Sequence, residues 1–151
     1  MNNNVKAAEK MERKNTDQLQ QELMSGNDLD RVLADNDSSF QGYALQERLQ
    51  TLFRWRDISK TALARQSGIS EVYLHQVFAG RRTPSRNRLL CLCFGLGVSV
   101  DEAQELLQHA RLAPLYPRDR RDAIVIFGLS HGITLEEIND KLYAEDLDTL
   151  C

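Results

Sequence analysis

The pattern of helix caps and glycines within residues 59–85 constrains the fold of this chain more than any other feature. Ser59 and Ser70 each precede a short segment with helical spacing, and a serine hydroxyl there can cap free backbone N–H groups. Gly68 can supply the positive φ of a tight turn between the segments, and Gly80 can end the second. The pattern predicts two short helices joined by a glycine turn and followed by a basic loop.

The two predicted helices, 60–66 and 71–79, have the residues that a closely packed pair needs. Ala64 is small enough to let the helices cross at short distance. Apolar side chains that can close the core beneath them are Leu63, Ile69, Leu74 and Val77. A pair of this kind can place its second helix in the major groove of DNA.

The segment SKTALARQSGISEVYLHQVFAGRRTPS resembles the helix-turn-helix of the lambda-repressor-like (XRE) family. That family's usual pattern has a polar-polar-Leu-Ala start, a Gly-apolar-Ser turn and a Gly-basic-x-Pro exit. The resemblance extends from about Tyr43 to about Leu107, because YALQERLQTLFRWRDI looks like the first helix and NRLLCLCFGLGVSVDEAQELL like the fourth and the start of the fifth. A later segment, APLYPRDRRDAIVIFGLSHG, resembles an extension of such regulators from Gram-positive bacteria.

The resemblance implies an all-α fold built around a five-helix, lambda-repressor-like DNA-binding domain at residues 41–112. Residues 1–40 are then a polar, partly helical N-terminal extension, and residues 113–151 a helical C-terminal extension. Apolar spacing and caps predict the remaining helices. These are Thr16 to Met24, one at Leu29 to Leu33, one from about Tyr43 through Phe53, Arg86 to about Leu96, Ser99 to about Arg111, Arg118 to Ser130, and Thr134 to about Tyr143.

The same resemblance implies roles for residues on the second helix of the pair. It directs Glu71, Val72 and Gln76 toward base edges, and Tyr73 toward the DNA backbone or a thymine methyl. Gln76 has the chemistry for a bidentate contact to adenine, and Glu71 could accept a hydrogen bond from a cytosine amino group. The family's phosphate anchor falls on Lys60. Further candidates for phosphate contacts are Arg81, Arg82, Arg86 and Arg88.

Charge is distributed unevenly along the chain. Residues 41–88 carry 9 basic and 3 acidic side chains, net +6. Residues 1–40 carry 5 basic and 8 acidic side chains, net −3, and residues 89–151 carry 5 and 11, net −6. The overall charge of −3 therefore conceals a basic middle, which is typical of a nucleic-acid footprint.

The composition also bears on compartment and class. No apolar run approaches the roughly 20 residues of a membrane span, and the N-terminal residues lack the apolar segment of a secretory signal. We expect a protein of the bacterial cytoplasm, associated with the nucleoid when bound to DNA. We expect no metal site, cofactor or enzymatic activity, because no catalytic or phosphate-binding motif is present and the three histidines are far apart.

Three cysteines, Cys91, Cys93 and Cys151, match neither a disulfide framework nor the usual zinc spacings. Cys91 and Cys93 are predicted to be small buried residues of a helix, with a redox switch as the alternative. Arg118, Arg120 and Arg121 alternate with aspartates at the start of a predicted helix. They are interpreted as local ion pairs there, with anion binding as the alternative.

A second hypothesis is a protein-interaction adaptor that reuses the same helical fold to bind a signalling or transcription partner. Its first support is that VYLHQVFAG is apolar for a helix in a charged groove, with Val72, Tyr73 and Phe78 in surplus over the core. Its second support is that the segments on either side of the basic middle are acidic. The main hypothesis remains a sequence-specific DNA-binding regulator that acts as a homodimer on double-stranded DNA. The predicted dimer or effector surface consists of Ile124, Phe127, Leu135 and Leu142.

Overall fold

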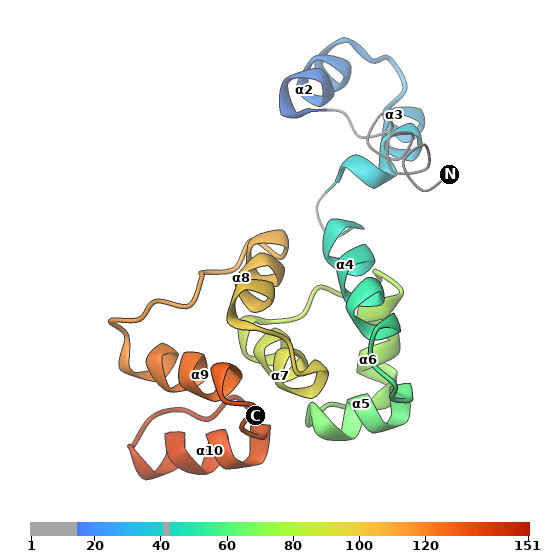
Figure 1. Cartoon of the computed structure of the whole chain (residues 1–151). Coiled ribbons are helices and arrows are strands. Elements are labelled where there is room, and N and C mark those ends of the chain that lie inside the picture. The colour runs from blue at the N-terminus through green and yellow to red at the C-terminus, as the bar shows by residue number, and fades with distance from the viewer. Residues whose placement is uncertain (1–14, 41–42) are drawn as a thin grey trace. The chain divides into compact units, whose positions relative to one another are not determined.

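The computed structural model describes residues 15–40 and 43–151, and within these ranges all regular structure is helical (Figure 1). The chain forms two compact units, one up to Ala44 and one from Leu45 to Cys151. None of the helices in the described ranges has the length and apolarity that crossing a lipid bilayer requires. The all-α fold expected from the sequence is confirmed.

The described part of the first unit contains two helices and a 3₁₀ turn: α2 (Thr16–Ser25), α3 (Leu29–Asp35) and η1 (Asp37–Ser39). Asn15 and Gln18 form a reciprocal capping box at the start of α2. The Asn36 side-chain amide donates to the Glu22 carboxylate and to the Val32 carbonyl, both at 2.8 Å. These bonds join α2 to the end of α3. The two helices correspond to those predicted at Thr16 to Met24 and at Leu29 to Leu33.

The second unit contains seven helices within the part of the chain that is described. Their bounds are α4 (Tyr43–Arg54), α5 (Lys60–Gln66), α6 (Glu71–Phe78), α7 (Arg86–Leu96), α8 (Val100–His109), α9 (Arg120–Ser130) and α10 (Leu135–Ala144). Of the polar, partly helical extension predicted at residues 1–40, the first fourteen residues lie outside the described ranges. The extension predicted from residue 113 packs within the same unit as the preceding helices.

Helix α7 is the centre of the core because it is apolar on nearly every side. Five consecutive residues, from Leu89 to Cys93, have no solvent exposure, and α7 contacts α5, α8 and α10. A helix that is apolar all round is stable only when other elements surround it. Cys91 and Cys93 are thus buried, as predicted, and neither forms a disulfide.

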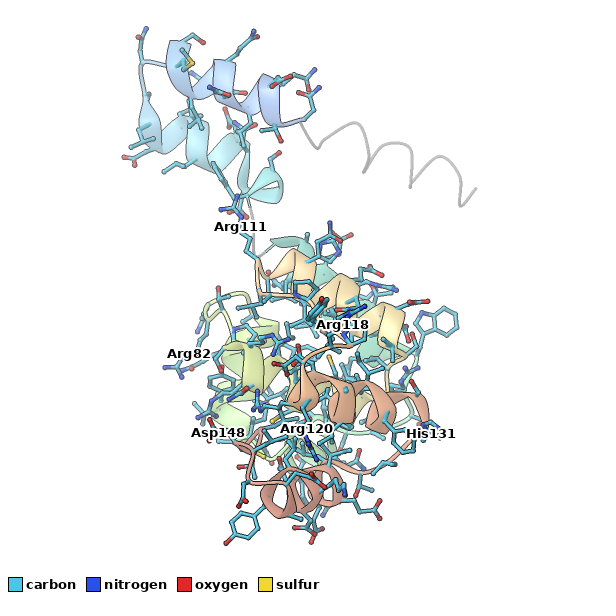
Figure 2. The ribbon with its side chains drawn as sticks, turned by 90° about the vertical axis from the view of Figure 1, so that its left-hand side faces the viewer. Arg82, Arg111, Arg118, Arg120, His131 and Asp148 are labelled. Carbon is cyan, nitrogen blue, oxygen red and sulfur yellow. The ribbon has the colours of Figure 1, made fainter. Side chains whose placement is uncertain are left out.

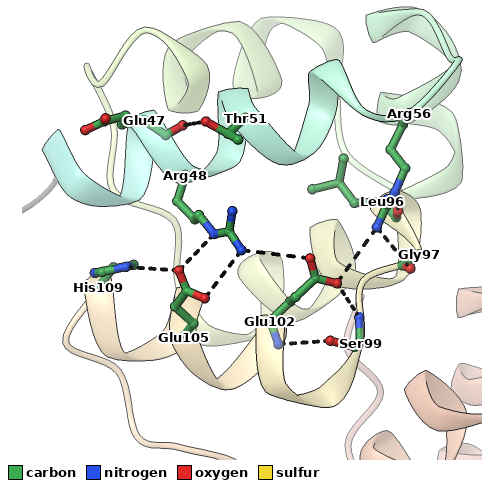
Figure 3. A network of polar contacts seen from close by, with 10 residues as sticks. All are labelled: Glu47, Arg48, Thr51, Arg56, Leu96, Gly97, Ser99, Glu102, Glu105 and His109. Carbon is green, nitrogen blue, oxygen red and sulfur yellow. Dashed lines mark hydrogen bonds and ion pairs between the residues drawn. The ribbon is translucent and has the colours of Figure 1, made fainter. Parts of the chain in front are cut away.

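Polar contacts tie α4 to α8, and the segment after α4 to the end of α7, at the surface of this core (Figure 3). Arg48 forms an ion pair with Glu105 at 2.8 Å, and the Arg56 guanidinium donates to the backbone carbonyls of Leu96 and Gly97. Gly97 ends α7 with φ of 63°. Both contacts hold the first helix of the basic region against the core.

Residues 112–117 form a link between α8 and α9, and a side chain of α8 holds it in place. The Gln104 amide donates to the Leu115 carbonyl at 2.8 Å and accepts from the Leu115 N–H at 2.7 Å. The predicted helix 118–130 begins at Arg120, because Asp119 serves as its N-cap and accepts from the Asp122 N–H. Leu135 and Leu142, predicted to lie on an interaction surface, are instead 7% and 0% exposed and belong to the core.

Candidate nucleic-acid interface

The caps and the glycine turn predicted around α5 and α6 are all formed. The Ser59 hydroxyl accepts from the Ala62 N–H, and the Ser70 hydroxyl accepts from the Tyr73 N–H, both at 3.1 Å. Gly68 lies between the helices with φ of 62°. Because each of these features depends on residues no more than a few positions apart, the sequence sufficed to locate them.

Helix α6 has one face in the core and one in solvent. Leu74 and Val77 are buried, as predicted, while Glu71 and His75 are exposed and Val72 is 68% exposed. The Gln76 side chain is half-buried at the border of the two faces. Three of the four predicted base-reading residues, Glu71, Val72 and Gln76, thus lie on or beside the exposed face.

Phe78 accounts for much of the apolar surplus on α6. Its side chain is 4% exposed and contacts the Phe53 ring of α4 edge to face, with a centroid distance of 5.5 Å. The Gln50 amide of α4 donates to the Phe78 carbonyl at 2.9 Å. Phe78 therefore joins α6 to α4 within the core, and it is not a free apolar residue on the surface of α6.

Tyr73, the fourth predicted base-reading residue, has a different environment. It is 9% exposed, and its ring lies against two guanidinium groups, those of Arg82 at 5.0 Å and Arg88 at 4.7 Å from the ring centroid. Such cation–π contacts orient the guanidinium groups. We correct the sequence-based role accordingly: Tyr73 supports two arginines and does not extend toward a ligand itself.

A groove of about 800 Å³ runs beside the exposed face of α6. Cationic side chains reach it from three places: Arg54 at the end of α4, Lys60 at the start of α5, and Arg81 after α6. Its other lining residues are Gln50, Phe53, Val72, His75, Gln76, Phe78 and Ala79. None of these described lining residues carries a carboxylate, so the groove attracts anions.

The cationic side chains around this groove are available for contacts. Within the described ranges, Arg54 and Arg81 have no ion-pair partner, and Lys60 lies over the Phe78 ring at 5.7 Å from its centroid. The Arg82 guanidinium donates to the Gln76 side-chain oxygen at 3.4 Å, which holds the loop after α6 beside the helix. Figure 2 shows Arg82 at the edge of the unit.

Arg86, predicted to contact phosphate, is engaged within the protein. Its guanidinium binds both carboxylate oxygens of Asp122 at 3.1 and 2.9 Å, and it donates to the carbonyls of Ala113 and Pro114 at 2.9 and 3.1 Å. Asp122 is 6% exposed. These four contacts join α7 to α9 and to the link before it. We therefore no longer assign Arg86 a phosphate contact.

Sequence reasoning missed Arg54 and His75. Arg54 is the last residue of α4, and only the approach of α4 to α6 brings it to the groove. His75 follows Glu71 and Val72 by four and three positions, so helical spacing alone could have identified it as part of the exposed face.

The remaining titratable clusters have structural roles. Arg121 donates to the carbonyls of Asp148 and Thr149 and to the Asn87 side chain, and Arg120 forms an ion pair with Glu145. The local ion pairs expected between these arginines and the neighbouring aspartates are not formed among the described residues, because Arg120 pairs with Glu145 and Asp122 pairs with Arg86. Anion binding is not favoured either, because the Arg120 and Arg121 guanidinium groups are engaged within the protein. The residues that the structure describes contain no group of three or more side chains able to hold a metal ion.

Comparison with protein families matches residues 44–106 to the helix-turn-helix domain. Residues 44–106 are a helix-turn-helix domain of the lambda-repressor-like group. The match begins within α4 and ends within α8, so this helix-turn-helix domain contains α5, α6, α7 and the cationic groove. Searches of curated proteins and of solved structures returned no significant match. A domain of this kind suggests DNA binding.

Proposed function

We propose that the protein is a sequence-specific DNA-binding transcriptional regulator that inserts α6 into the major groove. The observation that supports it most is the groove beside α6, where Arg54, Lys60 and Arg81 meet without a carboxylate among the described lining residues. Cationic side chains beside an inserted helix can contact backbone phosphates and so fix the position of the helix in the groove. These three residues belong to different elements and meet in one groove beside α6. The proposal is a binding function, without catalysis.

Backbone contacts are assigned to five cationic residues: Arg54, Lys60, Arg81, Arg82 and Arg88. Each phosphate that they neutralise releases condensed counterions, so the logarithm of affinity falls with the logarithm of salt concentration by about 0.9 per phosphate. The contact of Tyr73 with Arg82 and Arg88 restricts both guanidinium groups before DNA is bound. Less conformational entropy is then lost on binding.

Base recognition is assigned to the exposed side of α6. Gln76 can bind adenine through its N6 and N7 atoms, Glu71 can accept from a cytosine amino group, and Val72 can contact a thymine methyl. Val72 is the most exposed of the apolar side chains on this helix. A single helix makes a small interface, so we expect a homodimer on a two-fold operator, in the bacterial cytoplasm.

The adaptor hypothesis has lost one of its two supports, the apolar surplus of α6. Of the three surplus side chains, Tyr73 and Phe78 are buried and only Val72 remains exposed. One exposed valine is common on protein surfaces and indicates no partner. DNA is therefore the favoured ligand of this surface.

The test is selection from a library of random double-stranded DNA at low salt, followed by affinity measurements on the enriched sequence. We expect Arg81→Ala with Arg82→Ala to weaken binding to all sequences alike and to lower the salt slope by about 0.9 for each lost phosphate contact. Gln76→Ala should change the preferred base at one position of each half-site. Arg118→Ala is the matched control, because Arg118 is exposed but lies outside the groove. Recovery of no duplex above background would reject the proposal.

A further inference from the structure

A second groove, of about 630 Å³, lies between the two helices of the C-terminal extension, α9 and α10, which pack side by side (Figure 1). Its apolar lining comes from Ile124 and Phe127 on α9, from Ile138 on α10 and from Ile133 between them. Phe127 is 55% exposed, and the His131 ring stacks on it at a centroid distance of 3.9 Å. An exposed aromatic residue beside an apolar groove is typical of an interaction surface.

Gly128 lets α10 pack closely against α9 beneath this groove. A Cβ atom at this position would lie 2.4 Å from the Ile138 side chain, so only glycine lets α10 approach α9 this closely. The close approach brings Ile138 to the floor of the groove. The packing of α10 on α9 therefore determines the floor of the groove. Leu135 and Leu142 of α10 do not contribute to the floor, because they are directed into the core.

The charges around this groove differ between its two ends. At the end where α9 begins, Arg120 forms an ion pair with Glu145, and Lys141 forms another with the same carboxylate at 2.9 Å. These three groups leave a net charge of +1. At the opposite end, the lining carboxylate is that of Glu137, in the first turn of α10. The groove thus has a positive end, an apolar middle and a negative end.

We propose that the α9–α10 groove docks against the same groove of a second copy, with the two α9 helices antiparallel around a two-fold axis. A two-fold axis reverses the direction of the pattern, so the positive end at Arg120 meets the negative end at the second copy's Glu137, and the converse contact forms as well. The apolar middles then cover each other around Phe127. Two helices from each copy form a four-helix bundle.

This interface leaves the proposed DNA surface free. The two grooves share no lining residue. In Figure 2, Arg82 and His131 lie at opposite edges of the unit, so the end of α9 is remote from the loop that follows α6. This inference depends on the proposed function in one respect: a two-fold operator is bound by two copies of the protein. Self-association is measured without DNA, so each proposal can fail without the other.

The first test is sedimentation equilibrium of the full chain and its variants in the absence of DNA. We expect a dimer for the natural sequence, and at least a tenfold weaker association for Phe127→Asp. Tyr143→Asp is the matched control, because Tyr143 on α10 is 78% exposed but does not line the groove. The proposal would be overturned if the natural sequence stayed monomeric over a 100-fold range of concentration. It would also be overturned if both variants weakened association equally.

The second test exchanges the charges at the two ends. Arg120→Glu alone places carboxylates opposite each other at both contacts of the dimer, and Glu137→Arg alone places cations opposite each other. Each single variant should therefore dimerise more weakly than the natural sequence. A mixture of the two variants should form a heterodimer with both contacts restored. Damage to the fold of one variant cannot be repaired by the other, so failure of the mixture to associate would reject the antiparallel arrangement.

Discussion

The guanidinium of Arg86 and the carboxylate of Asp122 form a bidentate ion pair, with nitrogen–oxygen distances of 3.1 and 2.9 Å. This pair connects α7 of the helix-turn-helix domain to α9 of the C-terminal extension. Asp122 also accepts from the Tyr116 N–H at 3.0 Å, so its carboxylate is fully engaged while 6% exposed. The extension is thereby anchored to the helix that forms the centre of the core.

Replacing Arg86 by Met should destabilise the fold. Removing one partner of a buried ion pair leaves an uncompensated charge, here on Asp122, and typically costs about 3 kcal/mol in free energy of unfolding. Urea denaturation followed by circular dichroism measures this loss. Arg81→Met, at an exposed position, should change stability by less than about 0.5 kcal/mol. An Arg86→Met variant of natural stability that binds DNA weakly would instead restore Arg86 as a phosphate contact.

Tyr73 should act on DNA affinity through its ring and not through its hydroxyl group. Tyr73→Phe keeps both cation–π contacts and should leave affinity within about twofold. Tyr73→Leu removes them, so Arg82 and Arg88 each lose about 0.5–1.5 kcal/mol more side-chain entropy on binding, and affinity should fall at least several-fold for every sequence. Fluorescence anisotropy with matched and scrambled duplexes measures the effect. Base-specific loss in Tyr73→Phe would mean that the hydroxyl group reads a base.

Gly95 should not tolerate even a methyl group. A Cβ at this position of α7 would lie 1.9 Å from the Oγ atom of Ser67, the C-cap residue of α5. Gly95→Ala should therefore destabilise the fold by about 2 kcal/mol, which thermal unfolding measures. The Ser67 hydroxyl is buried and has no hydrogen-bond partner within the described residues. Ser67→Ala should accordingly cost little alone and lessen the loss caused by Gly95→Ala. An equal loss in both backgrounds would refute this steric explanation.

The buried thiols should make stability depend on pH in the alkaline range. Burial, and for Cys91 also the neighbouring Cys151, raises the pKa of the Cys91 and Cys93 thiols from 9.0 to about 12. Below pH 9 the thiols are neutral in both states and the full stability is present. Between pH 9 and 12 the unfolded chain loses these protons first, so stability falls as pH rises. Denaturant unfolding at a series of pH values measures this effect. The free energy of unfolding should decline less steeply with pH for Cys93→Ala than for the natural sequence.

The same burial predicts a pattern of chemical reactivity. Cys151 is exposed, whereas Cys91 and Cys93 have no solvent exposure. Iodoacetamide at neutral pH should therefore modify Cys151 alone in the folded protein and all three cysteines after unfolding, as mass spectrometry can count. Rapid modification of Cys93 in the folded protein would revive the redox-switch hypothesis.

Two arginines on one helix show where sequence reasoning reached its limit. Arg86 and Arg88 were equivalent as basic residues after Pro84, and both were predicted to contact phosphate. Arg88 lies against Tyr73, close to the surface of α6, whereas Arg86 is bound by Asp122 from a segment 36 positions away. The difference depends on which side of α7 the later helices cover, and no local pattern reports that.

The sequence by itself determined the helices, their caps and the glycine turn, because a cap or a turn is a hydrogen bond or a dihedral angle set within about four residues. Ser59, Gly68 and Ser70 illustrate this. Only the tertiary structure decided which side chains of α6 and α7 remain free for a ligand. Tyr73 and Arg86 are engaged by groups from other segments, and such long-range contacts depend on how complete helices pack together.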